Sequence, residues 1–172
     1  GYLRLAPSPD NIHQVLIEER AADALIACDA VVASSPKASV HFRPGMGVVL
    51  NRAEMPTGDL VLHRDAALEI DRREAMVRRE IGDAPMTSFD ANKLAQQLMG
   101  DTVFANIMLL GAAWQAGLVP LSETALKQAM ALNNVAVENN KIAFDIGRLQ
   151  VADPAALSAL LSPPIHQPDG FE

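Results

Sequence analysis

Residues 100–148 decide the fold, and they read GDTVFANIMLLGAAWQAGLVPLSETALKQAMALNNVAVENNKIAFDIGR. From Val103 to Val119 the residues are almost all apolar, and only Asn106 and Gln115 are strongly polar. No face of such a helix is left for water, so we predict a buried rod. An unmatched buried amide costs about 1–3 kcal/mol, so Asn106 is expected to have an internal hydrogen-bond partner.

Two more helices are expected after this rod. Ser122 is a favourable N-cap residue, so a helix should run over 122–132, and a third is expected over 135–148. Gly111 and Gly147 lie within the first and third of these helices, and we interpret them as places where two helices approach closely. Three consecutive helices around one apolar rod predict a helical core, which says more about fold than about chemistry.

The composition bounds the class of protein. A chain of 172 residues with 49% hydrophobic residues is expected to form one domain, over residues 1–162, followed by a loose tail over 163–172. The net charge of −7 and the pI of about 5.0 argue against nucleic acid or an anionic membrane as a partner. The single cysteine, Cys28, excludes an internal disulfide and a self-contained iron–sulfur cluster, and it favours a cytoplasmic location. The apolar run 103–119 is shorter than the roughly 20 residues of a membrane span, so no membrane segment is predicted.

The first half of the chain predicts a parallel sheet. Residues 24–28 and 47–51 are short apolar runs typical of buried strands, and a helix is expected between them over 30–40. Strand, helix and strand in this order are typical of a parallel βαβ unit. A third strand is expected at 86–89, with Asp90 as the N-cap of the helix that follows it.

The rest of the chain predicts shorter or more exposed elements. They are an edge strand at Tyr2–Leu5, a strand or irregular connection at 12–17, a short strand at 60–62, an exposed helix at 65–80 and a last helix at 153–161. The helix over 65–80 is rich in charge, and ion pairs such as Glu74 with Arg78 are expected along it.

No catalytic motif is evident. The sequence has no phosphate loop, no G-x-G-x-x-G after a strand and no G-x-S-x-G. Cys28 ends a predicted strand and could be a functional thiol. A small core residue is the favoured interpretation, because the carboxylate of Asp29 raises the pKa of the neighbouring thiol. Four histidines form no metal-ligand spacing and are best interpreted as surface or hydrogen-bonded residues: His13, His41, His63 and His166.

Two polar clusters leave alternatives open. The first consists of four arginines, which could hold the phosphates of a nucleotide-like ligand: Arg72, Arg73, Arg78 and Arg79. Pairing within the helix and solvation are the favoured explanation. The second cluster weakens the third helix with two adjacent asparagines, and it consists of Glu138, Asn139, Asn140 and Lys141. It either lies on the exposed side, which is favoured, or contacts another domain or subunit.

The sequence also resembles a known family. The helical part carries Gly100-Asp101, Asn106, Leu110-Gly111, Ala113-Trp114-Gln115, Gly117 to Ser122, Leu132-Asn133, Val135 to Glu138, Asn140, Ala143-Phe144 and Gly147-Arg148. The upstream part carries Leu3 to Pro7, Asp10, Ile12-His13, Ala22-Asp23, Cys28-Asp29, Arg43-Pro44-Gly45, Val49, Asn51 and Pro56-Thr57. In this order they resemble the gamma-type domain of the 2-oxoacid:ferredoxin oxidoreductases, most closely the fused indolepyruvate ferredoxin oxidoreductases.

The resemblance implies a three-layer α/β/α domain with a mainly parallel sheet and a large C-terminal helical portion. It implies a multi-domain enzyme that decarboxylates an aryl-pyruvate such as indolepyruvate, forms an acyl-CoA and reduces ferredoxin. Thiamine diphosphate and iron–sulfur clusters are then bound by partner domains or subunits, this chain is inactive alone, and its role is structural with a contact to CoA. No catalytic, cofactor-binding or metal-binding residue can be carried over.

One departure from the family concerns the start of the chain. The family's domain opens with a glycine-rich strand-to-helix loop and a second strand, neither of which is present, so we expect an exposed sheet edge near Tyr2–Leu5. Two other functions remain open: a non-enzymatic interaction module that uses the Glu138–Lys141 cluster, and a small-molecule-binding α/β domain that uses the strand ends near Asp29 and Asn51.

Overall fold

The computed structural model describes residues 1–54 and 63–161. Its elements are η1 (Pro9–Asn11), β1 (Ala24–Ala27), α1 (Ala30–Ala33), α2 (Pro36–Ser39), β2 (Gly47–Asn51), α3 (His63–Ile81), β3 (Met86–Phe89), α4 (Ala91–Met99), η2 (Thr102–Phe104), α5 (Ala105–Gln115), α6 (Glu123–Asn133), α7 (Val137–Ala152) and α8 (Pro154–Leu161). The strand expected at 60–62 and the tail expected at 163–172 lie outside the described residues. No helix of the described residues is long and apolar enough to cross a membrane.

The described strands form a parallel sheet in the order β1-β2-β3. Parallel neighbours cannot be joined by a tight turn, so helices connect them: α1 and α2 between the first two strands, and α3 between the last two. The central strand β2 is buried along its whole length. The parallel βαβ pattern and the strand at 86–89 are therefore confirmed.

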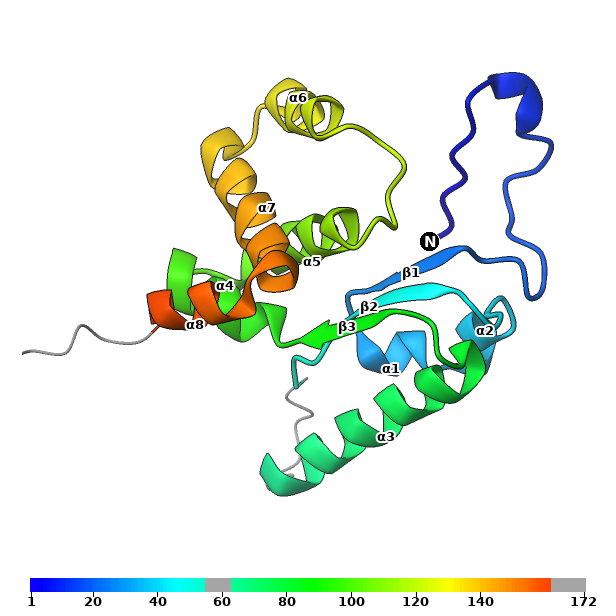
Figure 1. Cartoon of the computed structure of the whole chain (residues 1–172), viewed down its shortest axis with the longest axis horizontal. Coiled ribbons are helices and arrows are strands. Elements are labelled where there is room, and N and C mark those ends of the chain that lie inside the picture. Colours follow the sequence, from blue (N-terminus) through cyan, green and yellow to red (C-terminus); the bar gives the residue numbers. More distant parts are fainter. Residues whose placement is uncertain (55–62, 162–172) are drawn as a thin grey trace, which may run out of the picture.

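Helices cover both faces of this sheet, as Figure 1 shows. Val48 and Leu50 of β2 belong to the core shared with α1 and α3, whereas Val49 between them belongs to the core shared with α4, α5 and α7. Alternate residues of a strand point to opposite faces, so one short strand contributes to two hydrophobic cores. The three-layer α/β/α architecture with a large C-terminal helical portion is confirmed.

Two glycines bring α5 and α7 into backbone contact. A Cβ atom added to Gly111 would lie 2.0 Å from the carbonyl oxygen of Phe144, and one added to Gly147 would lie 1.9 Å from that of Met108. Neither helix could keep its position with any other residue at these two sites. The close approach expected at both glycines is confirmed, and it holds the helical layer together.

Helix ends follow the expected capping. Ser122 accepts a hydrogen bond from the backbone of Ala125 at the start of α6, and Asp90 does the same for Lys93 in α4. Asp153 accepts one from Ala156 as α8 begins. These side chains satisfy amide groups that have no partner inside the helix.

Three expectations about local structure are wrong. Asn106 is exposed, because α5 buries the side that carries Met108, Leu109 and Ala112, and position 106 falls outside that side. The helix expected over 30–40 is two short helices, because Ser35 and Pro36 start a new N-terminus.

The third wrong expectation concerns the N-terminal segment. Tyr2–Leu5 form no strand: the guanidinium of Arg4 donates to the carbonyl of Leu16, and the hydroxyl of Tyr2 contacts the ring of His41. The segment is therefore held by hydrogen bonds to the chain that follows it, at Leu16 and His41. Residues 12–17 form an irregular connection. Among the described residues, the edges of the sheet are β1 and β3.

Candidate functional site

Asn51 joins the carboxyl ends of the strands, where open α/β sheets usually bind ligands. Its side chain is only 3% exposed. The amide nitrogen donates to the carbonyl of Cys28 (3.1 Å) and to the side-chain oxygen of Asn92 (2.9 Å). The amide oxygen accepts from the backbone of Ala53 (3.1 Å) and of Ala91 (3.0 Å). This residue therefore uses its polar atoms to tie β1, β2 and α4 together.

Beside Asn51, an arginine links β2 to α3. Arg52 pairs with Asp71 at 2.5 Å and with Glu74, whose carboxylate also accepts from the hydroxyl of Ser88 at 2.9 Å. The hydrogen bond that the Arg52 guanidinium donates to Asp71 is the largest cause of the raised pKa of Arg52, and partial burial opposes it. The ion pair expected between Glu74 and Arg78 is wrong, because Glu74 faces the end of the sheet instead.

The thiol of Cys28 is exposed rather than buried, so its interpretation as a core residue is wrong. Its pKa is raised, first by partial desolvation and then by the charge of Asp29. Asp29 itself caps α1 by accepting from the backbone of Val31 (2.7 Å) and Val32 (3.2 Å). A thiol with a raised pKa is mostly protonated at neutral pH and is a poor nucleophile.

The histidines form no metal site within the described residues. In the part of the chain that the structure describes, no group of three or more histidine, cysteine or acidic side chains could hold a metal ion. His41 contacts the hydroxyl of Tyr2 at 3.0 Å and the carbonyl of Glu18 at 3.1 Å, so its ring is a hydrogen-bonded structural group. His166 lies outside the described residues.

Two of the four arginines on α3 have structural roles. Arg73 pairs with Glu69 at 2.6 Å and donates to the hydroxyl of Ser34 at 2.8 Å, which fastens α3 to α1. Arg78 donates to the carbonyl of Ala84 at 2.6 Å, just beyond the end of its helix. Pairing and local hydrogen bonding thus explain these two guanidinium groups without any ligand.

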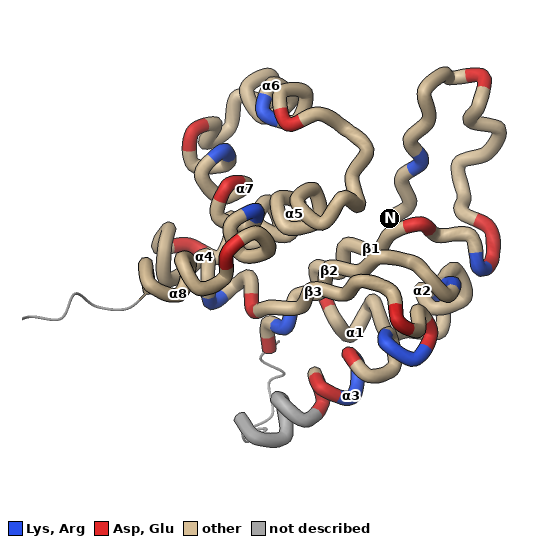
Figure 2. Tube along the Cα trace, in the orientation of Figure 1, with Lys and Arg blue, Asp and Glu red and all other residues tan. Residues whose placement is uncertain are grey.

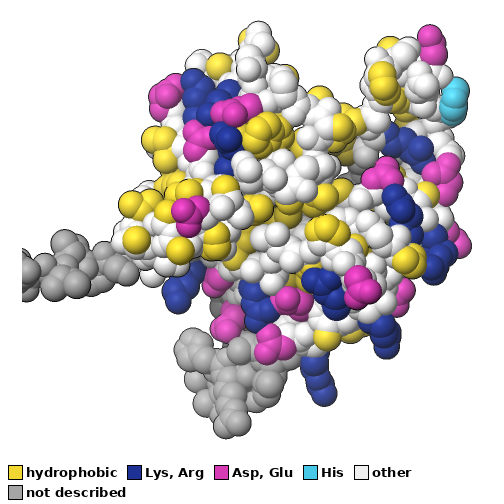
Figure 3. Space-filling model, viewed as in Figure 1, with side chains coloured by type: hydrophobic (Ala, Val, Ile, Leu, Met, Phe, Trp, Pro, Cys, Tyr) yellow, Lys and Arg dark blue, Asp and Glu magenta, His cyan; other side chains and the backbone are white. Residues whose placement is uncertain are grey.

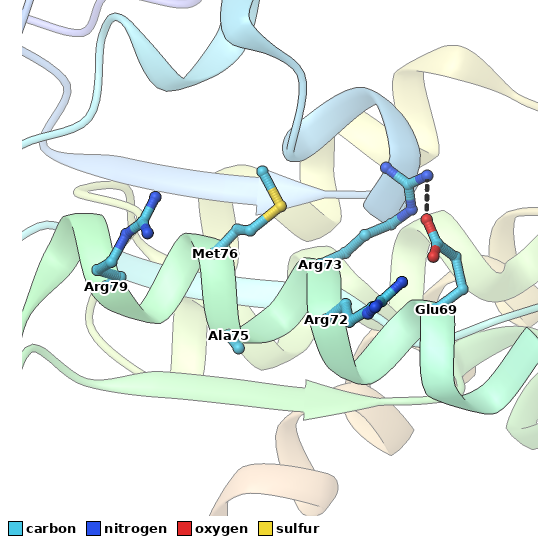
Figure 4. Close-up of a pocket in the computed structure, with 6 residues that line it drawn as sticks. All are labelled: Glu69, Arg72, Arg73, Ala75, Met76 and Arg79. Atoms are coloured by element: carbon cyan, nitrogen blue, oxygen red, sulfur yellow. Dashed lines mark ion pairs between the residues drawn. The ribbon is translucent and has the colours of Figure 1, made fainter.

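The other two arginines are left largely unpaired. Arg72 makes no ion pair with any described residue, and the carboxylate near Arg79 is that of Glu80, at 3.9 Å. Both line a shallow hollow of about 550 Å³ on the outer side of α3, drawn in Figure 4. Its described lining consists of Glu69, Arg72, Arg73, Ala75, Met76 and Arg79.

The polar cluster Glu138–Lys141 lies in the first turns of α7, beside its turn from α6. Lys141 pairs with Glu138 at 2.8 Å, and the side chain of Asn140 donates to the carbonyl of Val135 at 2.9 Å. That bond closes a turn in which Ala136 has a φ of 43°, a left-handed conformation that is unfavourable for alanine. Asn140 therefore has a local structural role, whereas Glu138 and Asn139 are exposed.

Exposed apolar side chains lie close to this cluster in the sequence. Leu132 is 79% exposed, Val135 is 61% exposed and Ile142 is 51% exposed. In Figure 1 the turn between α6 and α7 lies at the end of the helical layer that is far from the sheet. Several large apolar side chains gathered at a projecting turn are typical of a surface that contacts another protein.

An ion-pair network that the sequence analysis missed joins α6 to α7. Lys127 of α6 and Arg148 of α7 both contact Glu123 (2.8 and 2.9 Å) and Asp145 (2.9 and 3.1 Å). The guanidinium carbon of Arg148 also lies 4.7 Å from the ring centre of Trp114. The Glu123–Lys127 and Asp145–Arg148 pairs have helical spacings that a sequence could reveal, whereas the two pairs between α6 and α7 do not.

Comparison with known proteins identifies the family of this chain. A family profile described as "Pyruvate ferredoxin/flavodoxin oxidoreductase" matches residues 2–150. The chain belongs to this family. Its members are oxidoreductase subunits and domains, and the match includes the sheet, the α5–α7 crossing and the projecting turn.

Two curated relatives point to one branch of the family. The protein named indolepyruvate oxidoreductase subunit IorB of Thermococcus kodakarensis is 25% identical over 140 residues, which are 80% of this chain and 67% of that protein. The protein of the same name from Pyrococcus horikoshii is 26% identical over 140 residues, with the same coverage. No solved structure matches the chain.

Proposed function

We propose that this chain is the gamma-type part of an indolepyruvate-type 2-oxoacid:ferredoxin oxidoreductase. The parent enzyme would oxidatively decarboxylate an aryl-pyruvate, transfer the acyl group to CoA and reduce ferredoxin. The observation that carries this proposal is the family match over residues 2–150, together with two relatives named as indolepyruvate oxidoreductase subunits. This chain's own role is structural, and a contact with CoA belongs to the same proposal.

The chain's residues do not fit two cofactors of the parent enzyme, the iron–sulfur clusters and thiamine diphosphate with its metal ion. An iron–sulfur cluster is normally held by four thiolates, and the sequence contains one cysteine. No described group of side chains could bind a metal ion such as the one that accompanies a diphosphate. We therefore assign thiamine diphosphate and the clusters to partner domains or subunits, and we derive no catalytic step through this chain.

We assign the contact with these partners to the projecting turn between α6 and α7. The turn combines the polar residues Glu138, Asn139, Asn140 and Lys141 with exposed Leu132, Val135 and Ile142. An apolar centre with a polar rim is the usual composition of a protein interface. Asn140 already holds the turn in shape, so little conformational entropy would be lost on binding.

Reconstitution tests this proposal. The tagged chain would be co-expressed with the thiamine-binding and iron–sulfur subunits encoded beside it, and the purified complex assayed for CoA-dependent reduction of ferredoxin by indolepyruvate. We expect activity in the complex and none with the chain alone. A chain that neither joins such subunits nor affects their activity would contradict the proposal and favour the non-enzymatic module.

A pair of variants tests the assigned surface. Val135→Asp places a charge at the centre of the turn and should weaken assembly by about tenfold or more, as expected for one apolar contact worth about 1.4 kcal/mol. Val103→Asp is the matched control, since Val103 is also exposed (66%) but lies in η2. Equal affinities for the two variants would show that partners bind elsewhere.

A further inference from the structure

The outer side of α3 is built differently from the rest of this acidic chain. Ile70, Val77 and Ile81 face the sheet and are buried. The opposite side exposes Met76 (47%) and the two largely unpaired arginines, Arg72 and Arg79. Figure 2 shows the alternation of charge along this helix, and Figure 3 shows Lys and Arg side chains interspersed with Asp and Glu side chains in this region.

A second hollow extends this surface toward α1 and α2. It measures about 130 Å³ and shares Met76 and Arg79 with the larger one, and its far side includes Ser34, Pro36 and Phe42. The two hollows therefore form one groove along α3, bordered by the loop between α1 and α2. We call it the α3 groove.

The spacing of the free charges indicates the kind of occupant. Arg72 and Arg79 are separated by two helical turns, about 10 Å along the axis, and lie on the same side of α3. Figure 4 shows Met76 between them. A single phosphate could be held by one guanidinium but would leave the apolar floor and the second arginine unused. An elongated partner with two carboxylates and an apolar residue between them would use all three.

We propose that the α3 groove binds an acidic amphipathic helix of a partner protein. Two glutamates about two turns apart would form bidentate pairs with Arg72 and Arg79, and an apolar side chain between them would cover Met76. The net charge of the chain is −7, so its overall field repels such a partner. Attraction must therefore come from local pairing in the groove, and binding should weaken as salt increases. The α3 groove lies on the opposite side of the sheet from the turn between α6 and α7 (Figure 1). The proposal for this groove therefore does not depend on the proposed function.

Reversing the charges of the groove and of a designed peptide tests the proposal. The probe is a helical peptide with two glutamates seven positions apart and a leucine between them, titrated into the full chain while the methyl resonance of Met76 is followed by NMR. We expect saturable binding with a shift of that resonance. The double variant R72E/R79E should bind about tenfold more weakly or worse, and a peptide with lysines in place of the glutamates should bind this variant.

Controls separate the proposal from general electrostatics. Lys93→Glu on α4 makes a like change at an exposed site outside the groove and should leave the affinity unchanged. Absent binding, equal affinity for the wild type and R72E/R79E, or loss of binding in Lys93→Glu would overturn the proposal. Displacement of the peptide by stoichiometric inorganic triphosphate would also overturn it, in favour of a phosphate site.

Discussion

Replacing Gly111 or Gly147 by alanine should destabilise the protein, although alanine is the better helix former. The added methyl group would lie 2.0 Å or less from a backbone carbonyl oxygen of the facing helix, where ordinary contacts begin at 3.4 Å. The obstructing atoms belong to backbone and cannot rotate away. The helices would have to move apart by more than about 1 Å, which loosens the packing of Met108 and Phe144, both completely buried.

The expected magnitude follows from two opposing effects. Overpacking costs about 1–3 kcal/mol and occasionally more, and rigid backbone on both sides places these sites at the upper end of that range. Exchanging glycine for alanine within a helix returns about 1 kcal/mol. We therefore expect a net loss of about 2 kcal/mol for either variant. The double variant should lose less than the sum of both, because one separation of the helices accommodates both methyl groups.

Urea unfolding measures this effect. The single tryptophan, Trp114, has its ring centre 6.0 Å from that of Phe144, so its fluorescence reports on the crossing of α5 and α7. Ala131→Gly at an exposed position of α6 is the control, and it should lose about 1 kcal/mol through helix propensity alone. Stabilisation by either Gly→Ala change would refute the close-contact argument.

Two further predictions concern the carboxyl edge of the sheet. Asn51→Ala should lower the free energy of unfolding by about 3 kcal/mol, because it leaves buried groups on several segments unpaired, whereas Asn92→Ala should lower it by about 1 kcal/mol. Urea unfolding measures both losses, and equal losses would contradict a central role for Asn51. Cys28 should react with iodoacetamide more slowly than a free cysteine at neutral pH, because its raised pKa leaves less thiolate, and the rate should inflect at a higher pH than it does for a free cysteine. Asp29→Asn should move that inflection partway back while leaving the larger effect of desolvation, and an inflection at or below that of a free cysteine in the wild type would contradict the assigned environment.

The sequence carried much of the fold because its signals are local. Apolar runs bounded by turn residues predicted the strands at 24–28, 47–51 and 86–89, and side chains such as Ser122 predicted where helices begin. The same approach was wrong at Tyr2–Leu5, where loose alternation resembled a strand. Strand pairing depends on a partner, and alternation alone cannot supply one.

Tertiary structure decided which polar side chains are buried and hydrogen-bonded. Asn106 stands in the most apolar stretch of the chain and is exposed, whereas Asn51 closes an ordinary strand and is buried with its polar atoms hydrogen-bonded. Periodicity assigns an average face to a helix, but it cannot say how far a neighbouring helix covers that face. The partners of Asn51 come from segments that are distant in sequence, so no local pattern could reveal them.

The amino-acid sequence by itself determined the layers of this protein and its family, because strand length, helix capping and the spacing of Gly111 and Gly147 are properties of short segments. The tertiary structure alone decided which charges are paired between separate elements. It joined Arg148 of α7 to Glu123 of α6 and Lys127 of α6 to Asp145 of α7, and it left Arg72 without an ion pair among the described residues. A charged group forms an ion pair when an opposite charge lies close to it in space. The spacing of residues along the chain specifies that distance only within one helix.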